Sequence, residues 1–263
     1  MKSLLLLALW SWPLFATEID PRSIKWANEH IQNLTVIPEP SRASLYYLVN
    51  SLYCRLNDWR SYKPFYDELF TRAEVKKAYP DALPQDQTNA GMFMRVMDPG
   101  EKITDKSPLS WMAGKTVGEV FGYPGDMRLI QDTLAMGSRQ LWIVRQAYFA
   151  PQSTGRYNDA YHEMGHVLHL SLLTPSEYAA LEVLYATTKR NNNFMDTYAA
   201  NSSSEYIAQA LEAYLSETKP ARGWPATHSW TRASMKAQDP ALYQFIEAIV
   251  TSSHASRCKT LPQ

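Results

Sequence analysis

The segment Tyr161-His-Glu-Met-Gly-His-Val-Leu-His169, near the middle of the chain, decides how the rest of the sequence is interpreted. His162, Glu163 and His166 have the spacing H-E-x-x-H, and the apolar periodicity around them predicts a helix over residues 159–173. Residues four apart lie one turn apart on the same face of a helix, so both imidazoles reach one ion. The Glu163 side chain is offset around the helix, where it faces a water beside that ion.

This spacing predicts a catalytic zinc site. Zn²⁺ accepts imidazole nitrogens at ~2.0–2.1 Å and, in catalytic sites, keeps one position open for water. The ion lowers the pKa of that water towards ~7, and Glu163 is expected to remove its proton as general base. The alternative is a solvated helix face that carries His and Glu, which the apolar neighbours Val167, Leu168 and Leu170 disfavour.

A zinc site of this kind needs a third ligand from the protein. His169 shares the helix face but lies too far along the axis to join both other histidines on one ion. Leu172 excludes the longer metzincin pattern, which requires a histidine at that position. Cys258 is a less favoured ligand because it lies in the C-terminal tail. A carboxylate from a later helix is expected, and the candidates are Glu177, Glu182, Glu205, Glu212 and Glu217.

Two of these carboxylates lie on one face of a helix predicted over residues 204–217. Glu205 and Glu212 are ~10.5 Å apart along that helix at ~1.5 Å per residue, so only one of them reaches the ion. Ser202-x-x-Glu205 also fits a capping box, which gives Glu205 a purely structural alternative.

The residues around both helices resemble those of a known family. Gly165 stands before the second histidine, Glu205-Tyr-Ile-Ala-Gln-Ala210 is similar to the pattern E-[FY]-x-A-x-A, and Tyr198 lies seven residues before Glu205. Together with residues 240–246, which are similar to a terminal helix, these features resemble the catalytic domain of anthrax lethal factor and its relatives, including the secreted Pro-Pro endopeptidases. The resemblance covers roughly residues 140–250.

The resemblance implies a helix-rich zincin fold of the gluzincin-like type. It implies that His162, His166 and Glu205 bind zinc and that Tyr198 stabilises the oxyanion of the tetrahedral intermediate. His228 is the next candidate for the donor that contacts the oxyanion. The chain departs from the family at Gln209, where lethal factor has a glutamate, and this alters the surroundings of the metal ligands.

The order of elements along the chain favours an α+β fold, with a small mixed sheet beside the active-site helix. The polar, proline-bearing stretch 80–90 separates an N-terminal helical region, residues 17–90, from a metallopeptidase domain, residues 91–263. Segment 140–149 is either an edge strand that an extended peptide joins or an ordinary core strand. Helices are predicted over residues 41–56, 61–79, 159–173, 204–217 and 239–251, and strands over residues 92–97 and 140–149.

The start of the chain has the pattern of a secretory signal peptide. Residues 1–16 carry Lys2, an apolar run from Leu4 to Trp12 and a small residue at Ala16. We therefore expect a secreted or periplasmic protein. Export permits disulfides, and the two cysteines, Cys54 and Cys258, are expected to form one.

Composition narrows the classes of partner. The chain has 263 residues and a mass of 30.0 kDa, and its 26 Lys and Arg balance its 26 Asp and Glu. It lacks the basic surplus of a nucleic-acid binder, so no nucleic-acid partner is expected. Beyond the N-terminus no apolar stretch approaches the ~18 residues of a membrane span, and we expect a monomer that acts on a protein or peptide substrate.

The sequence thus predicts a secreted zinc metalloendopeptidase in which Glu163 activates the attacking water. Two alternatives stay open. One is a secreted attachment protein that keeps a vestigial zincin site. The complete set of site residues argues against this alternative, because a vestigial site is expected to have lost one of them. The other is a zinc hydrolase that acts on substrates other than proteins.

Overall fold

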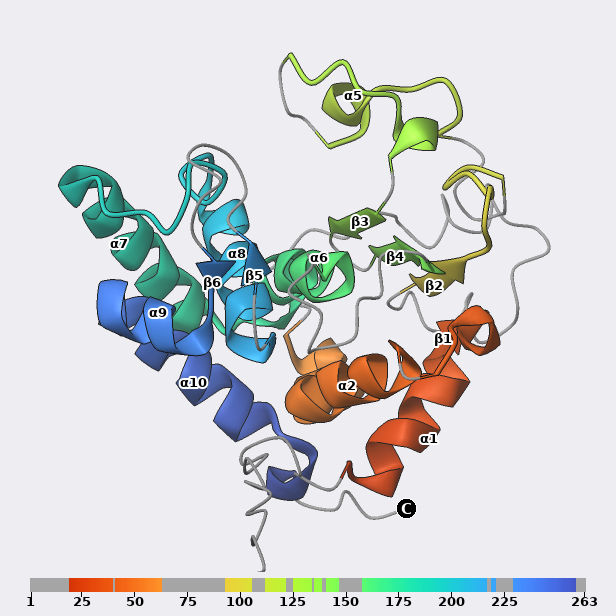
Figure 1. The fold of residues 1–263 in the computed structure, drawn as a ribbon, viewed down its shortest axis with the longest axis horizontal. Helices are drawn as coiled ribbons and strands as arrows, with labels where there is room; N and C mark the ends of the chain where they lie inside the picture. Colours follow the sequence, from red (N-terminus) through yellow and green to blue (C-terminus); the bar gives the residue numbers. More distant parts are fainter. Residues whose placement is uncertain are drawn as a thin grey trace, which may run out of the picture.

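A computed structural model gives the structure of the protein (Figure 1). It describes residues 19–39, 41–62, 93–105, 112–121, 125–133, 135–138, 141–146, 158–216, 219–220 and 229–258. The expected signal peptide at residues 1–16, nearly all of the predicted helix 61–79 and the boundary at residue 90 lie outside these ranges.

Helices dominate the described part of the chain, and a small mixed sheet accompanies them, as expected for an α+β fold. The sheet has the order β1-β2-β4-β3, and a separate two-stranded ribbon pairs β5 with β6. The helices are α1 (Pro21–His30), α2 (Ser41–Asn57), α5 (Val117–Phe121), α6 (Asp159–Val167), α7 (Pro175–Asn191), α8 (Ser203–Leu215), α9 (Arg232–Gln238) and α10 (Pro240–Ser253). The strands are β1 (Ile31–Gln32), β2 (Phe93–Met97), β3 (Ala135–Ser138), β4 (Leu141–Arg145), β5 (Lys219–Pro220) and β6 (Ser229–Trp230).

The sequence predictions for four helices and two strands are confirmed where the structure describes them. The helices α2, α8 and α10 begin and end within two residues of the predicted bounds. Helix 159–173 divides into α6 and a π-helical turn, Leu168–Leu172. Four helices, α1, α5, α7 and α9, and four strands, β1, β3, β5 and β6, were not predicted.

Strand β4 lies inside the sheet. It pairs in parallel with β2 on one side and antiparallel with β3 on the other. The edge-strand interpretation of residues 140–149 is therefore wrong, and the core-strand interpretation is confirmed. The physical reason is burial on both faces: Trp142 and Val144 join the main core, whereas the intervening Ile143 joins a second, smaller core. The edge of the sheet beside β4 is β3.

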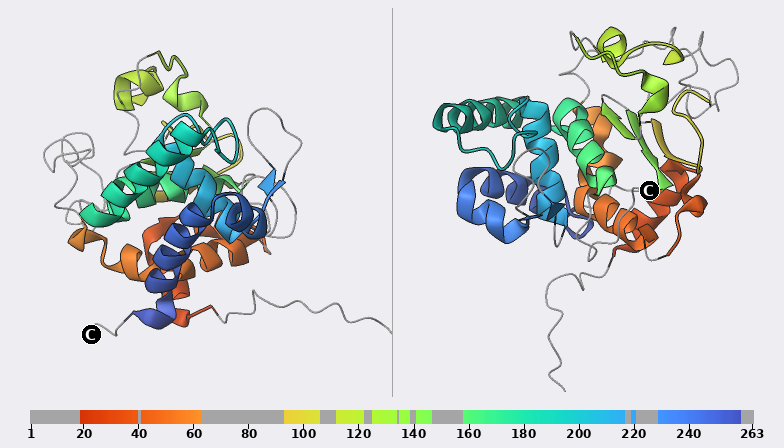
Figure 2. Two further views of the ribbon diagram at one scale, coloured as in Figure 1. Left: turned by 90° about the vertical axis from the view of Figure 1, so that its left-hand side faces the viewer. Right: turned by 45° about the horizontal axis from the view of Figure 1, so that its top comes forward.

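Helix α6 lies at the centre of the molecule, between the sheet and α8 (Figures 1 and 2). The indole Nε1 of Trp142 in β4 donates a hydrogen bond to the Ala160 carbonyl at 3.0 Å. On another side of the helix the Tyr161 hydroxyl donates to the Ser44 carbonyl of α2, also at 3.0 Å. These buried bonds fix both the position and the rotation of the helix that carries the H-E-x-x-H motif.

One hydrophobic core contains helices from the N-terminal and C-terminal parts of the described chain. It contains side chains of α1 and α2 together with those of α6, α8 and α10. The predicted disulfide between Cys54 and Cys258 is present, with a Cα–Cα distance of 5.4 Å, so Cys258 is not a metal ligand. The smaller core lies on the other face of the sheet, under the lobe that holds α5. No helix in the described ranges is both long and apolar enough to cross a membrane.

Candidate metal centre

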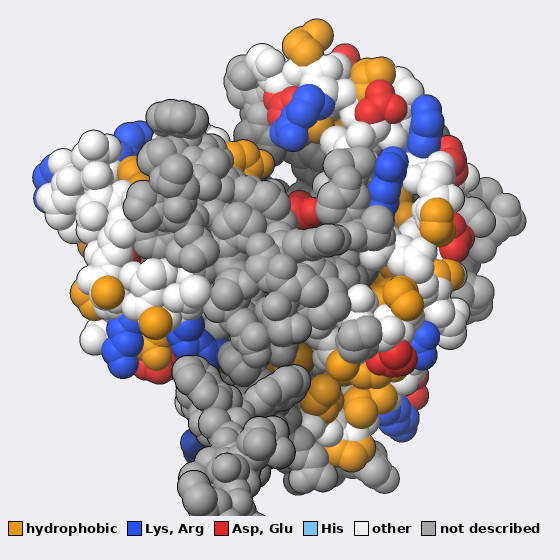
Figure 3. All heavy atoms as spheres, viewed as in Figure 1, with side chains coloured by type: hydrophobic (Ala, Val, Ile, Leu, Met, Phe, Trp, Pro, Cys, Tyr) orange, Lys and Arg blue, Asp and Glu red, His pale blue; other side chains and the backbone are white. Residues whose placement is uncertain are grey.

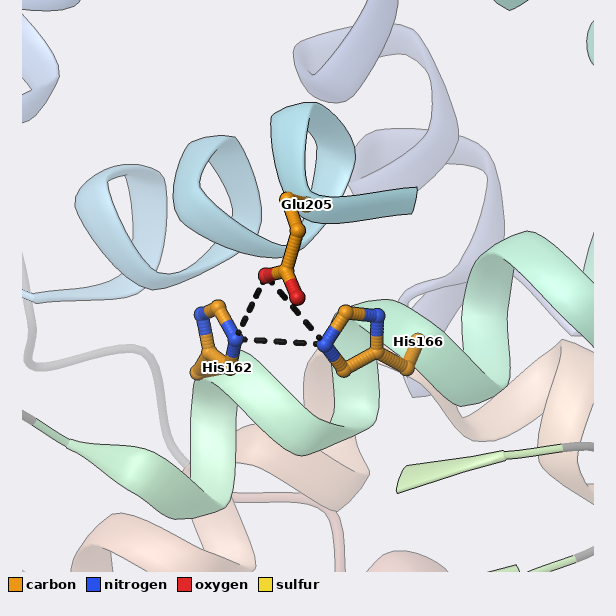
Figure 4. Close-up of side chains that lie close together, drawn as sticks. All are labelled: His162, His166 and Glu205. Carbon is orange, nitrogen blue, oxygen red and sulfur yellow. Dashed lines mark hydrogen bonds and ion pairs between the residues drawn. The ribbon is translucent and has the colours of Figure 1, made fainter. Parts of the chain in front are cut away.

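The structure brings three of the predicted site residues together (Figure 4). His162 and His166 extend from α6 and Glu205 extends from α8. The two Nε2 atoms lie 3.2 Å apart, and Glu205 Oε2 lies 3.2 Å from His162 Nε2 and 3.5 Å from His166 Nε2. Within the described residues, this is the one group of three or more His, Cys, Asp or Glu that is close enough to hold an ion.

The spacing and chemistry of this triangle fit zinc. Ligand atoms at ~2.0–2.1 Å from a tetrahedral ion lie ~3.3–3.4 Å from one another. All three measured separations are within ~0.2 Å of that value, which is the tolerance expected of a real site. Glu205 Oε2 is also shielded from solvent and accepts no hydrogen bond within the described part of the chain. Such an oxygen is costly to bury unless a cation compensates it.

The close crossing of α6 and α8 makes the triangle possible. A Cβ atom added at Gly165 would lie 2.4 Å from the Ala208 Cα, a distance that real Cβ atoms do not adopt. Only glycine at 165, opposite a small residue at 208, lets the two backbones approach this closely. The close approach is at the residue before His166 and about one turn after Glu205, so it limits the distance between these two side chains.

The Nδ1 atoms of both imidazoles face polar groups of α8. His166 Nδ1 lies 2.8 Å from Ser204 Oγ. His162 Nδ1 lies 3.1 Å from Gln209 Nε2 and 3.7 Å from Glu212 Oε2. A metal-binding histidine is ordinarily held by a partner at its other nitrogen, and both histidines meet that condition here.

Glu163 is held by the edge strand β3. Its carboxylate oxygen Oε2 accepts a hydrogen bond from the backbone N–H of Gly137. The strand runs so near to α6 that a Cβ atom at 137 would lie 1.9 Å from the Glu163 carbonyl oxygen. Glycine is therefore required at this position, and the Gly137 N–H holds the carboxylate of Glu163, the residue that follows His162.

Tyr198 lies beside the triangle, in the segment between α7 and α8. Its ring centroid is 5.9 Å from that of His162. Arg128 approaches from the lobe that holds α5. Its pKa is raised by hydrogen bonding to Asp126 and, in smaller measure, by the charges of Tyr198 and Glu205. A hollow beneath this lobe, with an acidic side chain at its floor, is visible from one side of the molecule (Figure 3).

The other predicted ligand candidates lie elsewhere. Glu177 forms an ion pair with Arg55 at 2.6 Å. His169 is turned by the π-helical segment towards Glu182, whose Oε1 lies 3.7 Å from His169 Nε2, and it stacks on Tyr178. Burial lowers the pKa of His169 to about 4. Glu217 and the alternative oxyanion donor His228 lie outside the described residues.

The capping alternative for Glu205 proves compatible with the metal site. The Glu205 backbone N–H donates to Ser202 Oγ at 3.1 Å, so Ser202 caps α8. The Glu205 carboxylate faces the two histidines, as its short distances to them show. One residue thus begins the helix with its backbone and completes the triangle with its side chain.

Sequence analysis missed Ser204 and Gly137. No spacing rule selects a serine that precedes a ligand, because its contact with His166 depends on how two helices cross. Gly137 carries a weak signal, since a glycine inside a strand often marks a close backbone approach. No protein-family model matches the chain, and no curated protein matches it either. The resemblance to the lethal factor family therefore stays a prediction from the motifs.

Proposed function

We propose that this protein is a secreted or periplasmic zinc metalloendopeptidase of the zincin type, which acts as a monomer on protein or peptide substrates. The observation that carries the proposal is the triangle of His162, His166 and Glu205, whose three edges of 3.2, 3.2 and 3.5 Å match the ligand spacing of tetrahedral zinc. Two imidazoles and one carboxylate form the ligand set of a catalytic zinc that keeps a position for water.

Zinc held by these three side chains would supply the positive charge that acidifies a water and polarises the carbonyl of the substrate. Glu163, next to His162 in sequence and steadied by the Gly137 N–H, takes the proton from the attacking water. The water oxygen bonds to the carbonyl carbon, the C–N bond breaks, and Glu163 returns the proton to the departing nitrogen.

Two further elements contribute to the proposed reaction. The Tyr198 hydroxyl, on a ring 5.9 Å from that of His162, donates a hydrogen bond to the carbonyl oxygen as negative charge develops there. Within the described residues β3 is the last strand of the sheet and runs alongside α6. An extended peptide would add beside it through main-chain hydrogen bonds other than that of the Gly137 N–H, which already donates to Glu163. Peptide addition is therefore assigned to β3 instead of residues 140–149, for which an edge strand was one of two alternatives.

The test uses the purified protein, a peptide library and mass spectrometry. Wild type is expected to contain about one zinc per chain and to cut peptides in a chelator-sensitive manner. Glu163→Gln is the matched variant, because it preserves shape and leaves the triangle intact while removing the base. It is expected to keep zinc and lose hydrolysis.

Each outcome separates the candidate functions. Absence of zinc from wild type, or full activity of Glu163→Gln, would contradict the proposal. Zinc without any peptide cleavage would favour an attachment protein with a vestigial site, or a hydrolase of other substrates.

A further inference from the structure

Glu212 is a fully buried carboxylate in α8 that lies on the Nδ1 side of the His162 ring. Its Oε1 accepts the backbone N–H of Asn158 at 2.8 Å, and its Oε2 lies 3.7 Å from His162 Nδ1. Asn158 is the N-cap of α6, so Glu212 is at the positive end of that helix. This position favours a negative charge. One carboxylate therefore accepts a hydrogen bond at the start of α6 and lies 3.7 Å from the imidazole one turn later, so a shift of less than about 1 Å would bring it to hydrogen-bond distance.

Zinc binding at Nε2 of His162 fixes the state of Nδ1. A neutral imidazole has one protonated and one unprotonated nitrogen, and the metal needs the unprotonated one. Nδ1 must then carry the hydrogen and needs an acceptor. His162 is 1% exposed, so bulk solvent does not supply that acceptor.

Two side chains of the described residues lie near this nitrogen. Gln209 presents its Nε2, a donor, at 3.1 Å from Nδ1. An N–H that faces another N–H is repulsive, so Gln209 satisfies the loaded site only by reversing its amide. The carboxylate of Glu212 accepts hydrogen bonds only and needs no reversal. A hydrogen bond to a charged acceptor is also about twice as strong as one to a neutral acceptor.

We propose that Glu212 accepts the Nδ1–H of His162 and is the positioning residue that aims the Nε2 lone pair at zinc. This inference rests on the proposed zinc function and assigns Glu212 a role outside the ligand set. The two histidines are then held unequally. His166 relies on the neutral hydroxyl of Ser204, whereas His162 relies on a buried charge. The charged partner makes His162 the stronger ligand.

The experiment measures zinc affinity by competition with a chromophoric chelator, together with the absorption spectrum of the Co²⁺-substituted protein. Glu212→Gln keeps the size of the side chain and an oxygen that can accept the Asn158 N–H. It is expected to lower zinc affinity ~10–100-fold and to shift the Co²⁺ bands. The comparison variant Gln209→Met, which removes the competing amide, is expected to lower zinc affinity less than Glu212→Gln does.

A rescue variant separates positioning from simple structural support. Gln209→Glu combined with Glu212→Gln moves the carboxylate one turn along α8, to the group that lies 3.1 Å from Nδ1. The pair is expected to recover affinity to within about threefold of wild type, which restoration of packing alone would not achieve. Should Glu212→Gln fail to fold, ¹⁵N spectra of zinc-loaded wild type still test the idea, because they must show His162 protonated at Nδ1 and hydrogen-bonded.

The outcomes distinguish this inference from the function on which it rests. Wild type without zinc affinity would overturn both. Wild type that binds zinc, with Glu212→Gln binding it equally well, would overturn the positioning role alone. The same holds if Gln209→Met loses more affinity than Glu212→Gln, because the amide would then be the acceptor.

Discussion

Gly165→Ala is expected to separate the metal ligands without changing any of them. The new Cβ atom would lie 2.4 Å from the Ala208 Cα, whereas ordinary contact begins at 3.4 Å. The obstacle is backbone, which does not rotate away as a side chain would. Helices α6 and α8 must therefore move apart by about 1 Å, a displacement that cores resist.

This displacement exceeds the distance tolerance of a zinc site, but it lowers the stability of the fold only slightly. The distances of 3.2 and 3.5 Å between Glu205 and the histidines would grow to about 4.2 and 4.5 Å, well beyond the ~0.2 Å tolerance of a zinc site. Overpacking lowers the free energy of unfolding by about 1–3 kcal/mol, whereas the higher helix propensity of alanine raises it by about 1 kcal/mol. The variant should thus fold, with zinc affinity at least ~100-fold lower, since moving a ligand costs more than removing its hydrogen-bond partner.

The assay is chelator competition, with thermal unfolding of the metal-free protein measured in parallel. Ala208→Gly is the matched control at the same crossing. It removes a methyl group and costs about 1 kcal/mol of helix stability, but it leaves the backbones where they are. Its zinc affinity should stay within about threefold of wild type. Equal zinc affinity in wild type and Gly165→Ala would refute the claim that this crossing limits the ligand distances.

Three further predictions concern other parts of the molecule. Tyr198→Phe should keep zinc and peptide binding while kcat falls ~10²–10³-fold, and a loss below threefold in steady-state kinetics would assign the oxyanion to another donor. Burial lowers the pKa of His169 from 6.5 to about 4. Between pH 6.5 and pH 4 the imidazole is therefore protonated in the unfolded state and neutral in the folded state. Stability should therefore fall by about 1–2 kcal/mol from pH 7 to pH 5 in denaturant titrations, but not in His169→Phe, which keeps the stack on Tyr178. Burial raises the pKa of Glu177, but hydrogen bonds from Arg55 outweigh it and hold that pKa below 4.5. The stability that the Arg55–Glu177 pair contributes is therefore present above pH 4.5 and is lost as the pH falls through the lowered pKa of Glu177. Glu177→Gln should lower the free energy of unfolding by about 2–3 kcal/mol at pH 7 and remove this loss in acid.

The helices that were predicted from the sequence are those with a continuous apolar face. The α8 helix buries nearly all of its side chains, and the apolar residues Ile207, Leu211 and Leu215 among them have helical spacing. The α7 helix buries only Leu181 and Thr188, and it has no apolar stripe to detect. Its capping box, Thr174 with Glu177, and the proline that follows Thr174 were the available signals. Strand β3 has four residues, including a glycine, too few for a pattern.

The residues of the candidate site likewise include some that sequence spacing predicts and others that it does not. His162 and His166 belong to one helix, where sequence spacing equals spatial position. Glu205 comes from a second helix, so its distance to the histidines depends on a crossing that no local pattern encodes, and the family resemblance supplied it instead. The π-helical turn rotates His169 away from the site, which the regular spacing of a helix does not reveal.

The bridge between Cys54 and Cys258 has a consequence for the response of the protein to proteolysis. It closes a loop of 204 residues that contains every proposed ligand and the base. Any single cut inside this loop leaves the two fragments covalently attached. A nicked molecule should therefore migrate as one chain on a denaturing gel until a reductant is added, and it should retain its zinc. A single cut that would separate an unbridged chain into two fragments therefore leaves this chain as one covalent molecule.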